Sequence, residues 1–548
     1  MSVYSEKGMD NIYEYIVIGS GPAGVHAAQT LVEAGKNVAV IDVGFNDEHY
    51  AKLVPDDDFE NIRKNDPSQF RFFLGDKFES INLNDLNAGA QLTPPRKHLI
   101  KDVDKFLPVI SDTFKPMESL AYGGLGAGWG LGCYVYSNYE IEESGLEADS
   151  LYKAYEVISN RIGISSCKDD ASEYTSGNLN NILPPLQMDT SIKKLYQKYL
   201  QQKEKFLNKN IYFGHPALAM LSVDYKNRRK TEYKDMDFYS DHNWHAYRAW
   251  MTIEELRKYP NFRYLNNLLA INFKEENGYV IIEGKDVSTN EGFSFQCKKL
   301  LLATGPLGSA RIVMRSFPKE ISRLPLLCNP YAYVPCINLS MLGKPLERFK
   351  SSMGQAVMLY DKDKTCENIS SVSLFTYRSL LIHKLIKEAP LNLSDGRKII
   401  QFLQSSFVIA GILHTERFSE KKYLEMVKDE SAYTGDKLAA HYELALDEKQ
   451  KVKSNERIIK SALRSLGCYP AMRHDPGYGS SIHYAGTIPF SEKEEYGTTA
   501  FNGKLNQTKN VYIADASGFR FLSAKGITFS IMANAHIVAN NAMKEDEC

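Results

Sequence analysis

The alternation of apolar and polar positions near the start of the chain predicts a strand, a helix and a second strand. Residues 15–18 form a short apolar run typical of a buried strand, and residues 25–34 have the spacing of an amphipathic helix. A glycine-rich turn at 19–24 joins them, and a second apolar strand is predicted at 36–41. This order indicates a βαβ unit whose turn lies at the carboxyl edge of the first strand.

Farther along the chain the pattern changes several times. Residues 46–117 are polar and irregular, which predicts a long excursion that is either a surface insertion or a loop covering a site. Residues 151–250 are mainly helical and charged, with a solvated helix over 191–206. Strand-like runs then predict a meander that leads into 299–305, followed by an antiparallel sheet of a second domain and a long helix. The runs are 262–273, 279–283 and 293–296 for the meander, 332–339, 356–360, 371–375 and 407–413 for the sheet, and 448–466 for the helix.

Glycine-rich segments lie near both ends and in the middle of the chain, so the nucleotide-binding domain is predicted to be discontinuous. The expected fold class is α/β: a Rossmann-like domain interwoven with an α+β substrate domain that contains the antiparallel sheet. The predicted boundaries are 11–150 for the first part of the nucleotide domain, 151–254 for a helical cap region, 255–315 for the second part, 316–467 for the substrate domain and 468–545 for the third part.

Composition narrows the function classes. The 66 Lys and Arg residues balance 67 Asp and Glu residues, and the formal charge of -1 argues against a dedicated nucleic-acid binder. The eight cysteines form no C-x-x-C pair and have no histidine at zinc-ligand spacing, so they are interpreted as reduced thiols of a cytoplasmic protein without a metal site. No signal peptide is recognisable, and no apolar run approaches the roughly 20 residues of a membrane span. The amphipathic segment 377–386 is the one candidate for peripheral membrane contact, although core packing explains the same pattern.

The first glycine turn carries the strongest local signal for chemistry. Its sequence, Gly19-Ser20-Gly21-Pro22-Ala23-Gly24, provides a tight turn, a close approach of the backbone to a pyrophosphate, and close packing of helix on strand. Asp42 ends the second strand 23 residues after Gly19 and suits an adenosine ribose with an unphosphorylated 2′-hydroxyl. The motif indicates a dinucleotide site and leaves FAD and NAD open.

Four further blocks accompany this motif in a fixed order. They are Asp-Val-Gly at 42–44, Gly-Gly-Leu-Gly-Ala-Gly-Trp-Gly at 123–130, Leu-Ala-Thr-Gly-Pro-Leu-Gly-Ser-Ala at 302–310, and the C-terminal pair His-Tyr-Ala-Gly-Thr at 483–487 and Val-Tyr-Ile-Ala-Asp-Ala-Ser at 511–517. With these blocks the chain resembles the glucose-methanol-choline (GMC) oxidoreductases, which are FAD-dependent enzymes that oxidise alcohols and sugars. Trp129 is more similar to the pyranose-oxidase-like branch. Little resemblance extends through 46–117 and 325–446.

The resemblance implies a set of residues around FAD. The pyrophosphate would lie on the glycine turn, the ribose at Asp42, the adenine near Ala270 and the isoalloxazine along the 123–130 loop. The implied cofactor residues are Gly19, Ser20, Gly21, Pro22, Ala23, Gly24, Asp42, Gly123, Gly124, Gly126, Trp129, Gly130, Ala270, Asp515, Ala516 and Thr528. FAD is expected to be non-covalent, because no His or Cys occupies the loop position at which some relatives attach flavin.

The resemblance also implies a catalytic base. In the family, the histidine of H-x-x-G-T takes the hydroxyl proton of the substrate while hydride passes to flavin N5, and His483 occupies that position here. The second His or Asn of the family is absent. Lys525, 42 residues after His483, is the nearest polar candidate; alternatively it points away, and Ser523 or no side chain takes the role.

The leading hypothesis is therefore an FAD-dependent dehydrogenase or oxidase that acts on the CH-OH group of a small alcohol or sugar. Its electron acceptor, oxygen or a carrier, is left open. The alternative is a flavin-dependent isomerase or cyclase without net oxidation, in which Lys525 organises the chemistry. A non-catalytic FAD-binding scaffold is a third hypothesis.

Overall fold

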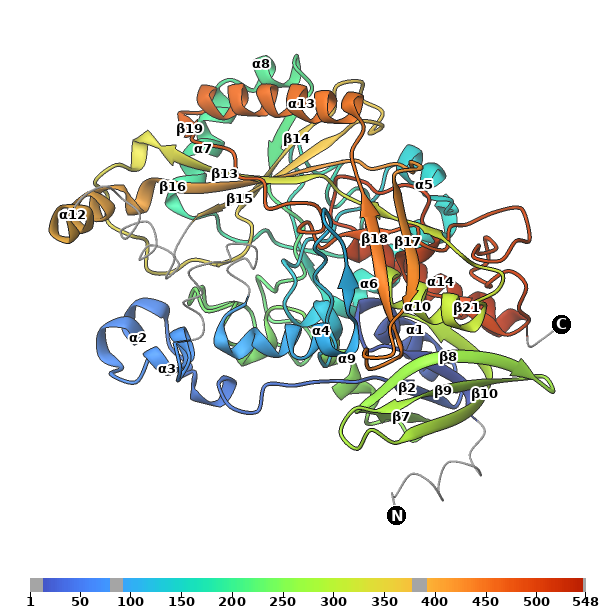
Figure 1. Ribbon diagram of the computed structural model, residues 1–548. Helices are drawn as coiled ribbons and strands as arrows, with labels where there is room; N and C mark the ends of the chain where they lie inside the picture. Colours follow the sequence, from blue (N-terminus) through green and yellow to red (C-terminus); the bar gives the residue numbers. More distant parts are fainter. Residues whose placement is uncertain (1–12, 79–91, 377–391, 546–548) are drawn as a thin grey trace.

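Two large sheets form the framework of the protein in the computed structural model, which describes residues 13–78, 92–376 and 392–545. One sheet is mainly parallel and lies near the two chain ends, and the other is antiparallel and lies in the upper half of Figure 1. The mixed α/β class expected from the sequence is confirmed.

The parallel part of the first sheet collects strands from distant parts of the chain. Its order is β7-β2-β1-β10, and β21 pairs with the far side of β10. The strands are β1 (Tyr13–Ile18), β2 (Val38–Ile41), β7 (Phe262–Leu265), β10 (Gly292–Leu302) and β21 (Val511–Ile513). Because all these pairings are parallel, the carboxyl ends of the strands meet at one edge. The predicted domain boundaries stay predictions.

The predicted meander extends this sheet. β8 (Leu268–Glu276) pairs antiparallel with β9 (Tyr279–Asp286), and β9 pairs antiparallel with the first half of β10. The second half of β10 lies between β1 and β21. One long strand therefore belongs to both the meander and the parallel sheet, which explains the unbroken apolar run at its end.

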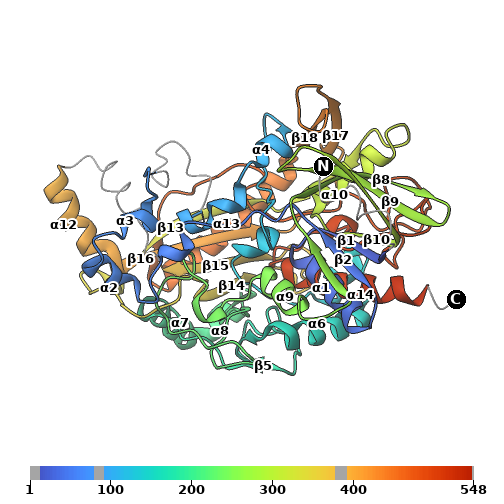
Figure 2. The same ribbon diagram turned by 90° about the horizontal axis from the view of Figure 1, so that it is seen from below.

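Small residues let two helices pack closely on the parallel sheet. α1 (Pro22–Glu33) begins with Pro at its first position, where the missing N–H costs nothing, and buries nine of its residues. α14 (Thr528–Lys544) lies beside it, and alanines of both helices share one core with β1 and β2. The same two helices lie together in the view from below (Figure 2).

The second sheet has six antiparallel strands in the order β19-β13-β16-β15-β14-β6. Its strands are β6 (Ile211–Gly214), β13 (Tyr331–Asn338), β14 (Ala356–Tyr360), β15 (Ser370–Thr376), β16 (Phe407–His414) and β19 (Cys468–Pro470). The four runs predicted to form an antiparallel sheet are confirmed as strands. The core between this sheet and its helices includes Leu195, Phe213 and Leu463.

Three helices cover the outer face of this second sheet (Figure 1). They are α7 (Thr190–Gln201), α8 (Lys203–Leu207) and α13 (Leu446–Ser465). The single helix predicted over 191–206 is broken at Gln202, whose φ of -121° and ψ of 18° are not helical. The long helix predicted over 448–466 is confirmed as α13.

A hairpin that the sequence pattern did not predict stands between the two large sheets (Figure 1). It consists of β17 (Lys422–Lys428) and β18 (Asp436–Tyr442), which pair with β11 (Leu324–Pro325) and β3 (Val109–Ile110) to make a four-stranded sheet. Charged residues in both strands of the hairpin obscure its apolar face, which contributes Leu424, Leu438 and Ala440 to the main core.

The excursion predicted at 46–117 is built mostly of short elements at its described positions. α2 (Phe59–Asn65) and α3 (Phe70–Leu74) hold a small apolar cluster with Met236, and they lie at the end of the molecule away from the parallel sheet (Figure 2).

The remaining elements of the described chain are η1 (Ala51–Leu53), η2 (Pro94–Ile100), α4 (Val103–Phe106), η3 (Gly124–Ala127), α5 (Asn138–Ser144), α6 (Ala148–Ile162), β4 (Ile164–Ser165), β5 (Ile182–Leu183), η4 (His242–Trp244), α9 (Ala249–Leu256), α10 (Pro306–Ser316), β12 (Leu327–Cys328), η5 (Leu339–Met341), α12 (Leu393–Leu403), η6 (Gln404–Ser406), β20 (Tyr484–Ala485) and η7 (Ala516–Gly518).

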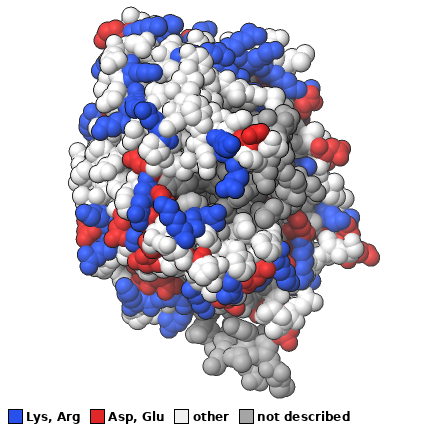
Figure 3. Space-filling view, turned by 90° about the vertical axis from the view of Figure 1, so that its left-hand side faces the viewer, with Lys and Arg blue, Asp and Glu red and all other residues white. Residues whose placement is uncertain are grey.

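Surface and sulfur chemistry agree with the composition. The face shown in Figure 3 carries both basic and acidic side chains, with Lys and Arg more frequent in its upper part. Every cysteine within the described ranges is a free thiol. Among the helices formed by those residues, none has the length and apolar character to cross a bilayer. The candidate membrane-contact segment 377–386 lies outside the described residues.

Candidate cofactor and active site

A cavity of about 380 Å³ connects the carboxyl edge of the parallel sheet with the inner face of the antiparallel sheet. Its lining includes fourteen of the eighteen residues predicted for the site. These are Gly19, Ser20, Gly21, Pro22, Ala23, Asp42, Gly124, Gly126, Trp129, Gly130, Ala270, His483, Asp515 and Thr528. Gly24, Gly123, Ala516 and Lys525 are not part of the lining.

The glycine turn between β1 and α1 has the geometry of an anion cradle. Gly19 has a φ of +99°, and a Cβ on it would lie 2.7 Å from the Ala303 carbonyl oxygen. A Cβ on Gly24 would lie 1.8 Å from the Gly19 carbonyl oxygen, so this glycine serves helix packing instead of lining the cavity. A Cβ on Gly21 would meet no atom within 4 Å, and no side chain caps the helix there. The start of α1 therefore offers its backbone to a negative group in the cavity.

Asp42 is joined to both glycine segments through Ser20. The Gly123 N–H donates to Ser20 Oγ at 2.9 Å, and the Ser20 hydroxyl donates to Asp42 Oδ2. The Tyr264 hydroxyl donates to the same oxygen at 2.9 Å. Burial raises the pKa of Asp42 to about 6, and the hydrogen bonds from Ser20 and Tyr264 oppose that rise. A half-buried carboxylate with fixed donors suits the recognition of ribose hydroxyls.

The second glycine segment lies across the first turn of α1. A Cβ on Gly124 would lie 3.2 Å from Gly21 Cα, and a Cβ on Gly126 would lie 2.8 Å from Pro22 Cγ. Trp129 Nε1 donates to the Tyr247 carbonyl oxygen at 2.9 Å, which fixes the indole at the end of the segment. The absence of side chains thus lets this loop run close to the start of α1 and beside the cavity.

Two C-terminal elements complete this side of the cavity. The buried carboxylate of Asp515 accepts hydrogen bonds from Ser309 Oγ at 2.6 Å and from the Ser517 backbone N–H at 2.9 Å. Burial raises its pKa, and these donors oppose the rise. Ala516 is fully buried behind it. Thr528 lines the cavity as the first residue of α14, so a second helix N-terminus is directed to the cavity.

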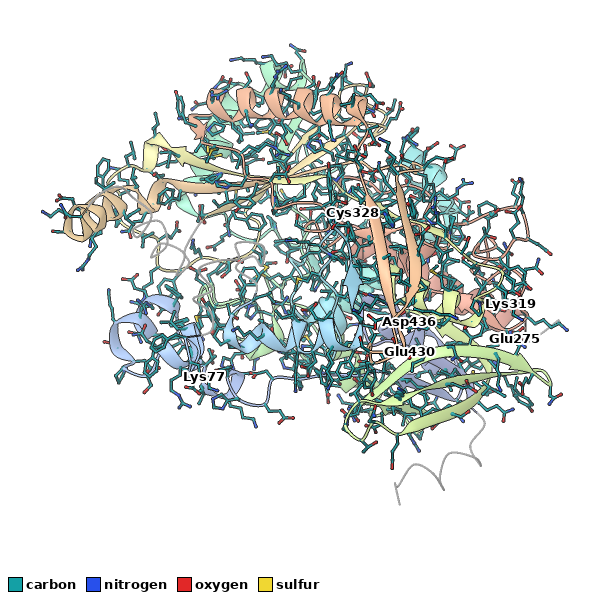
Figure 4. The ribbon with its side chains drawn as sticks, in the orientation of Figure 1. Lys77, Glu275, Lys319, Cys328, Glu430 and Asp436 are labelled. Carbon is teal, nitrogen blue, oxygen red and sulfur yellow. The ribbon has the colours of Figure 1, made fainter. Side chains whose placement is uncertain are left out.

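The end of the cavity near Ala270 is an apolar slot flanked by paired charges. Leu269, Ala270 and residues of α10 line it. Arg311 forms a 2.6 Å ion pair with Glu118, and Arg315 forms a 2.6 Å ion pair with Asp436, which Figure 4 labels at the hairpin tip above the meander. Apolar walls with neutralised charges suit a flat heterocycle such as adenine.

His483 lies where the C-terminal motif meets the antiparallel sheet. Its Nδ1 is 3.1 Å from Asn329 Oδ1. Asn329 Nδ2 donates to the carbonyl oxygens of His414 at 2.7 Å and Ser523 at 3.0 Å, so the amide is oriented with its oxygen toward the imidazole. Cys328, the preceding residue, lies in the middle of the molecule in Figure 4.

This arrangement fixes the proton on His483. Because the Asn329 oxygen accepts, Nδ1 carries the hydrogen and Nε2 keeps its lone pair. Burial lowers the pKa of His483 to about 4. The imidazole is therefore neutral at neutral pH, and it is a cavity-lining base with a defined tautomer.

The part of the lining that comes from the antiparallel sheet is uncharged. Ser371, Ser373 and Phe375 alternate along β15 and line the cavity, and Leu413 of β16 lies opposite Ser371. Tyr134 adds a phenol to the same lining. Hydroxyl groups and apolar surface therefore line the same cavity as the base.

Lys525 is not brought to this cavity. Its Nζ forms a 2.6 Å ion pair with Glu140 and donates to the Val135 carbonyl oxygen at 2.7 Å. The Lys525 side chain is 1% exposed and that of Glu140 is not exposed. Ser523 Oγ donates to the other oxygen of Glu140, so both residues considered for the second catalytic position belong to this buried cluster. The spacing between His483 and Lys525 in the sequence does not indicate Glu140. The Glu140 carboxylate attracts the Lys525 ammonium group away from the cavity.

Three residues that contribute to the site were not predicted from the sequence. Asn329 lies 154 residues before His483, in a Cys-Asn-Pro turn between β12 and β13 that no motif distinguishes. Tyr264 lies on β7, where its alternation with buried residues indicated a strand and nothing more. Tyr134 lies shortly after the glycine-rich segment. Its position four residues after Gly130 was the only available signal.

Comparison of the whole chain with solved structures gives relatives in fold. An FAD-dependent oxidoreductase from Chaetomium thermophilum, in complex with a butanamide fragment, has a TM-score of 0.58 at 12% identity, covering 98% of this chain and 100% of that one. Pyridoxine 4-oxidase from Mesorbium loti has a TM-score of 0.54 at 13% identity, covering 97% and 99%. No family model matches the sequence, and no curated protein matches it. The chain thus shares its fold with FAD-dependent oxidoreductases along nearly its whole length.

Proposed function

We propose that the protein is an FAD-dependent oxidoreductase that oxidises a hydroxyl group of a small, uncharged alcohol or sugar-like molecule. The observation that carries the proposal is the neutral imidazole of His483, held as an Nε2 base in the cavity that also contains the glycine turn and Asp42. Membership of the GMC family, and of its pyranose-oxidase-like branch, forms part of the proposal.

The residues present fit FAD. The open space at Gly21 and the uncapped start of α1 accommodate a pyrophosphate, Asp42 accommodates a ribose, and the slot beside Ala270 accommodates an adenine. Cys133 is fully buried, is absent from the cavity lining, and has a pKa raised by burial, so it does not present a reactive thiolate. FAD is accordingly proposed to bind without a covalent bond. When bound, FAD accepts the two electrons and the hydrogen that leave the carbinol carbon.

The protein side chains supply the proton chemistry and the orientation. His483 Nε2 accepts the hydroxyl proton of the substrate, and Asn329 keeps Nδ1 protonated so that Nε2 stays available. Because burial disfavours the imidazolium, the proton must pass on from Nε2 before the next turnover. Ser371, Ser373 and Tyr134 offer hydrogen bonds to further hydroxyl groups, and Phe375 and Leu413 exclude water.

The charge of the lining supports an uncharged substrate. Each charged residue of the lining already has a protein partner: Arg311 has Glu118, Arg315 has Asp436, and the carboxylates of Asp42 and Asp515 have hydroxyl donors. A charged substrate would therefore enter without a counter-ion from the described lining.

The alternative of a flavin-dependent isomerase or cyclase depended on Lys525 in the cavity. With Lys525 paired to Glu140, the cavity lining contains no lysine to organise such chemistry within the described residues. Reduction of the flavin by substrate still distinguishes the two reactions, because only net oxidation leaves the flavin reduced. A non-catalytic scaffold would give no reason for a cavity-lining histidine with a fixed tautomer.

The test begins with the flavin of the purified protein. We expect the yellow absorbance of oxidised flavin and its complete release on acid denaturation. Mixing the protein anaerobically with sugars, polyols, aromatic alcohols and nucleotide sugars should bleach the flavin stably for at least one class. Reoxidation by oxygen compared with artificial carriers then identifies an oxidase or a dehydrogenase. Protein that neither contains nor binds FAD would overturn the proposal.

A further inference from the structure

Three potential metal ligands converge outside the cavity. Cys167 and Asp169 lie in the segment after β4, and His215 follows β6 directly. One ligand atom of each residue, the Sγ, a carboxylate oxygen and a ring nitrogen, lies within 4.8 Å of the other two. The two segments are 46 residues apart between Asp169 and His215, so the cluster is a product of the fold.

Backbone groups hold the carboxylate of Asp169 in place. The His215 backbone N–H donates to Oδ2 at 2.8 Å, and the Ala171 backbone N–H donates to Oδ1 at 3.0 Å. His215 Nδ1 is 2.9 Å from the same Oδ2. A Cβ on Gly214 would lie 2.2 Å from Oδ1, so only glycine allows the carboxylate to approach the end of β6 so closely. Fixed orientation of a ligand by its outer hydrogen bonds is typical of metal sites.

The surroundings separate this cluster from an ordinary surface ion pair. The next residue, Asp170, forms an ion pair with Lys203 at 2.7 Å and accepts a hydrogen bond from the Tyr199 hydroxyl at 2.9 Å, so this lysine is engaged by Asp170. The ring of Tyr196 contacts the imidazole of His215 edge-on at 5.4 Å. The side chains of His215 and Asp169 are 17% and 7% exposed, which leaves an opening to solvent through which a hydrated ion can enter.

We propose that Cys167, Asp169 and His215 bind one Zn²⁺ ion, with water as the fourth ligand. A thiolate, an imidazole and a carboxylate are the ligand types that Zn²⁺ takes in tetrahedral sites. The Cys167 thiol loses its proton to solvent when the ion binds. A metal site was not predictable from close ligand spacing in the sequence, because these ligands come from two separated segments.

The ion would stabilise one edge of the six-stranded antiparallel sheet. β6 is the outermost strand on one side of the six-stranded sheet, and Asp169 and His215 would tie the 167–177 segment to its end. The Thr175 carbonyl oxygen accepts from the Val135 N–H at 2.8 Å, next to the cavity-lining Tyr134. The site therefore supports a cavity wall from outside, and the proposal does not depend on which substrate the cavity takes.

The experiment uses untagged full-length protein incubated with Zn²⁺ alone and then desalted. Metal analysis should find about one Zn²⁺ per chain, as a single set of three protein ligands requires. Cys167→Ser and His215→Gln should each lower retained Zn²⁺ to a small fraction of that amount. His441→Gln is the matched control, because His441 also faces a carboxylate, Glu425 at 3.6 Å, but has no cysteine in its pair; it should retain the full amount.

Replacement of Zn²⁺ by Co²⁺ gives a second measurement that does not depend on affinity. Thiolate coordination by Cys167 should give tetrahedral Co²⁺ absorption bands at longer wavelengths than oxidised flavin, and Cys167→Ser should abolish their thiolate component. The variants are compared by circular dichroism so that unfolding is recognised. Wild-type protein that retains no stoichiometric Zn²⁺, or folded Cys167→Ser and His215→Gln proteins that both retain it, would overturn the proposal.

Discussion

His483 and Lys525 both lie in the C-terminal part of the chain, yet their surroundings differ in one decisive respect. Asn329 satisfies one nitrogen of His483 and leaves the other as a base in the cavity. The Lys525 ammonium group is paired with Glu140 and donates to the Val135 carbonyl oxygen, and Lys525 lies outside the cavity lining. A polar side chain becomes available for chemistry when its fold leaves one group unsatisfied toward a cavity, and burial near a motif is not sufficient.

The largest expected effect tests the His483 half of this comparison. His483→Ala removes the base while the glycine turn and Asp42 are unchanged, so FAD content should stay near that of the wild type. Anaerobic flavin reduction, measured by stopped flow with the best substrate, should slow by roughly 10²- to 10⁴-fold. His474→Ala is the control, because His474 stacks on Tyr333 with ring centroids 5.1 Å apart and is absent from the cavity lining. Undiminished reduction in His483→Ala would contradict the assignment.

Lys525→Met tests the other half, with stability as the measurement. Breaking a buried pair leaves Glu140 as an uncompensated buried charge, and we expect a loss of about 3–5 kcal/mol in the free energy of unfolding. Flavin reduction per folded molecule should change by less than about tenfold, that is less than 1.4 kcal/mol. The double variant Glu140→Gln with Lys525→Met should recover part of the stability, because the two effects are coupled. A large loss of reduction rate at unchanged stability would instead place Lys525 in catalysis.

A smaller effect is expected when the histidine stays and its orientation is released. Asn329→Ala removes the acceptor of Nδ1–H, so the imidazole is free to place its proton on Nε2, where it cannot act as a base. We expect a decrease in the reduction rate of about 10- to 100-fold, because a wrong tautomer disables a base without removing it. The substrate concentration at half-saturation should change little.

Loss of buried hydrogen bonds in Asn329→Ala needs its own control. Asn338 is fully buried, and its Nδ2 donates to the Ser191 carbonyl oxygen at 3.0 Å on the far side of the sheet from His483. Asn338→Ala should lower thermal stability to a similar extent and leave flavin reduction nearly unchanged. If both variants lose rate equally, Asn329 acts through general stability and not through the imidazole.

Much of the fold was predictable because its signals are local. Short apolar runs in the sequence indicated β1, β2 and β10. The glycine turn between β1 and α1 indicated a strand–turn–helix unit. The β17–β18 hairpin was missed because charged residues such as Lys422 and Asp436 take up positions in both strands. Lys422 is buried against Glu416, so a charge that indicated solvent in the sequence is neutralised inside the fold.

The candidate site likewise contains residues that were predictable from local sequence and residues that were not. Glycine positions 19, 21 and 24 were predictable because each answers a local steric demand of the turn. The partner of His483 was not predictable, since Asn329 comes from a strand end 154 residues away and meets the imidazole only after the sheet has formed. The position of Lys525 depended on Glu140, which the helix cap at Ser137 holds in place.

Asp42 gives the comparison its smallest expected effect. Its half-buried carboxylate accepts hydrogen bonds from the protein and still lines the cavity. Its pKa is raised to about 6, so the carboxylate is present above that pH and is neutralised as the pH falls through it. If the carboxylate accepts hydrogen bonds from FAD ribose hydroxyls, FAD affinity should fall by up to about tenfold on acidification, the worth of roughly one hydrogen bond. Asp42→Asn should bind FAD more weakly at neutral pH and lose this pH dependence.

Tyr264→Phe gives that prediction a direction. The Tyr264 hydroxyl lowers the pKa of Asp42 by donating to the charged form, so its removal should raise that pKa and move the fall in FAD affinity to higher pH. Titration of the apoprotein with FAD, followed by quenching of flavin fluorescence between about pH 5 and 8, the range around the raised pKa, measures the shift. A shift to lower pH, or a pH dependence that persists in Asp42→Asn, would mean that another group controls FAD binding. Asp42 would then resemble Lys525, a buried charge held by the protein for its own fold.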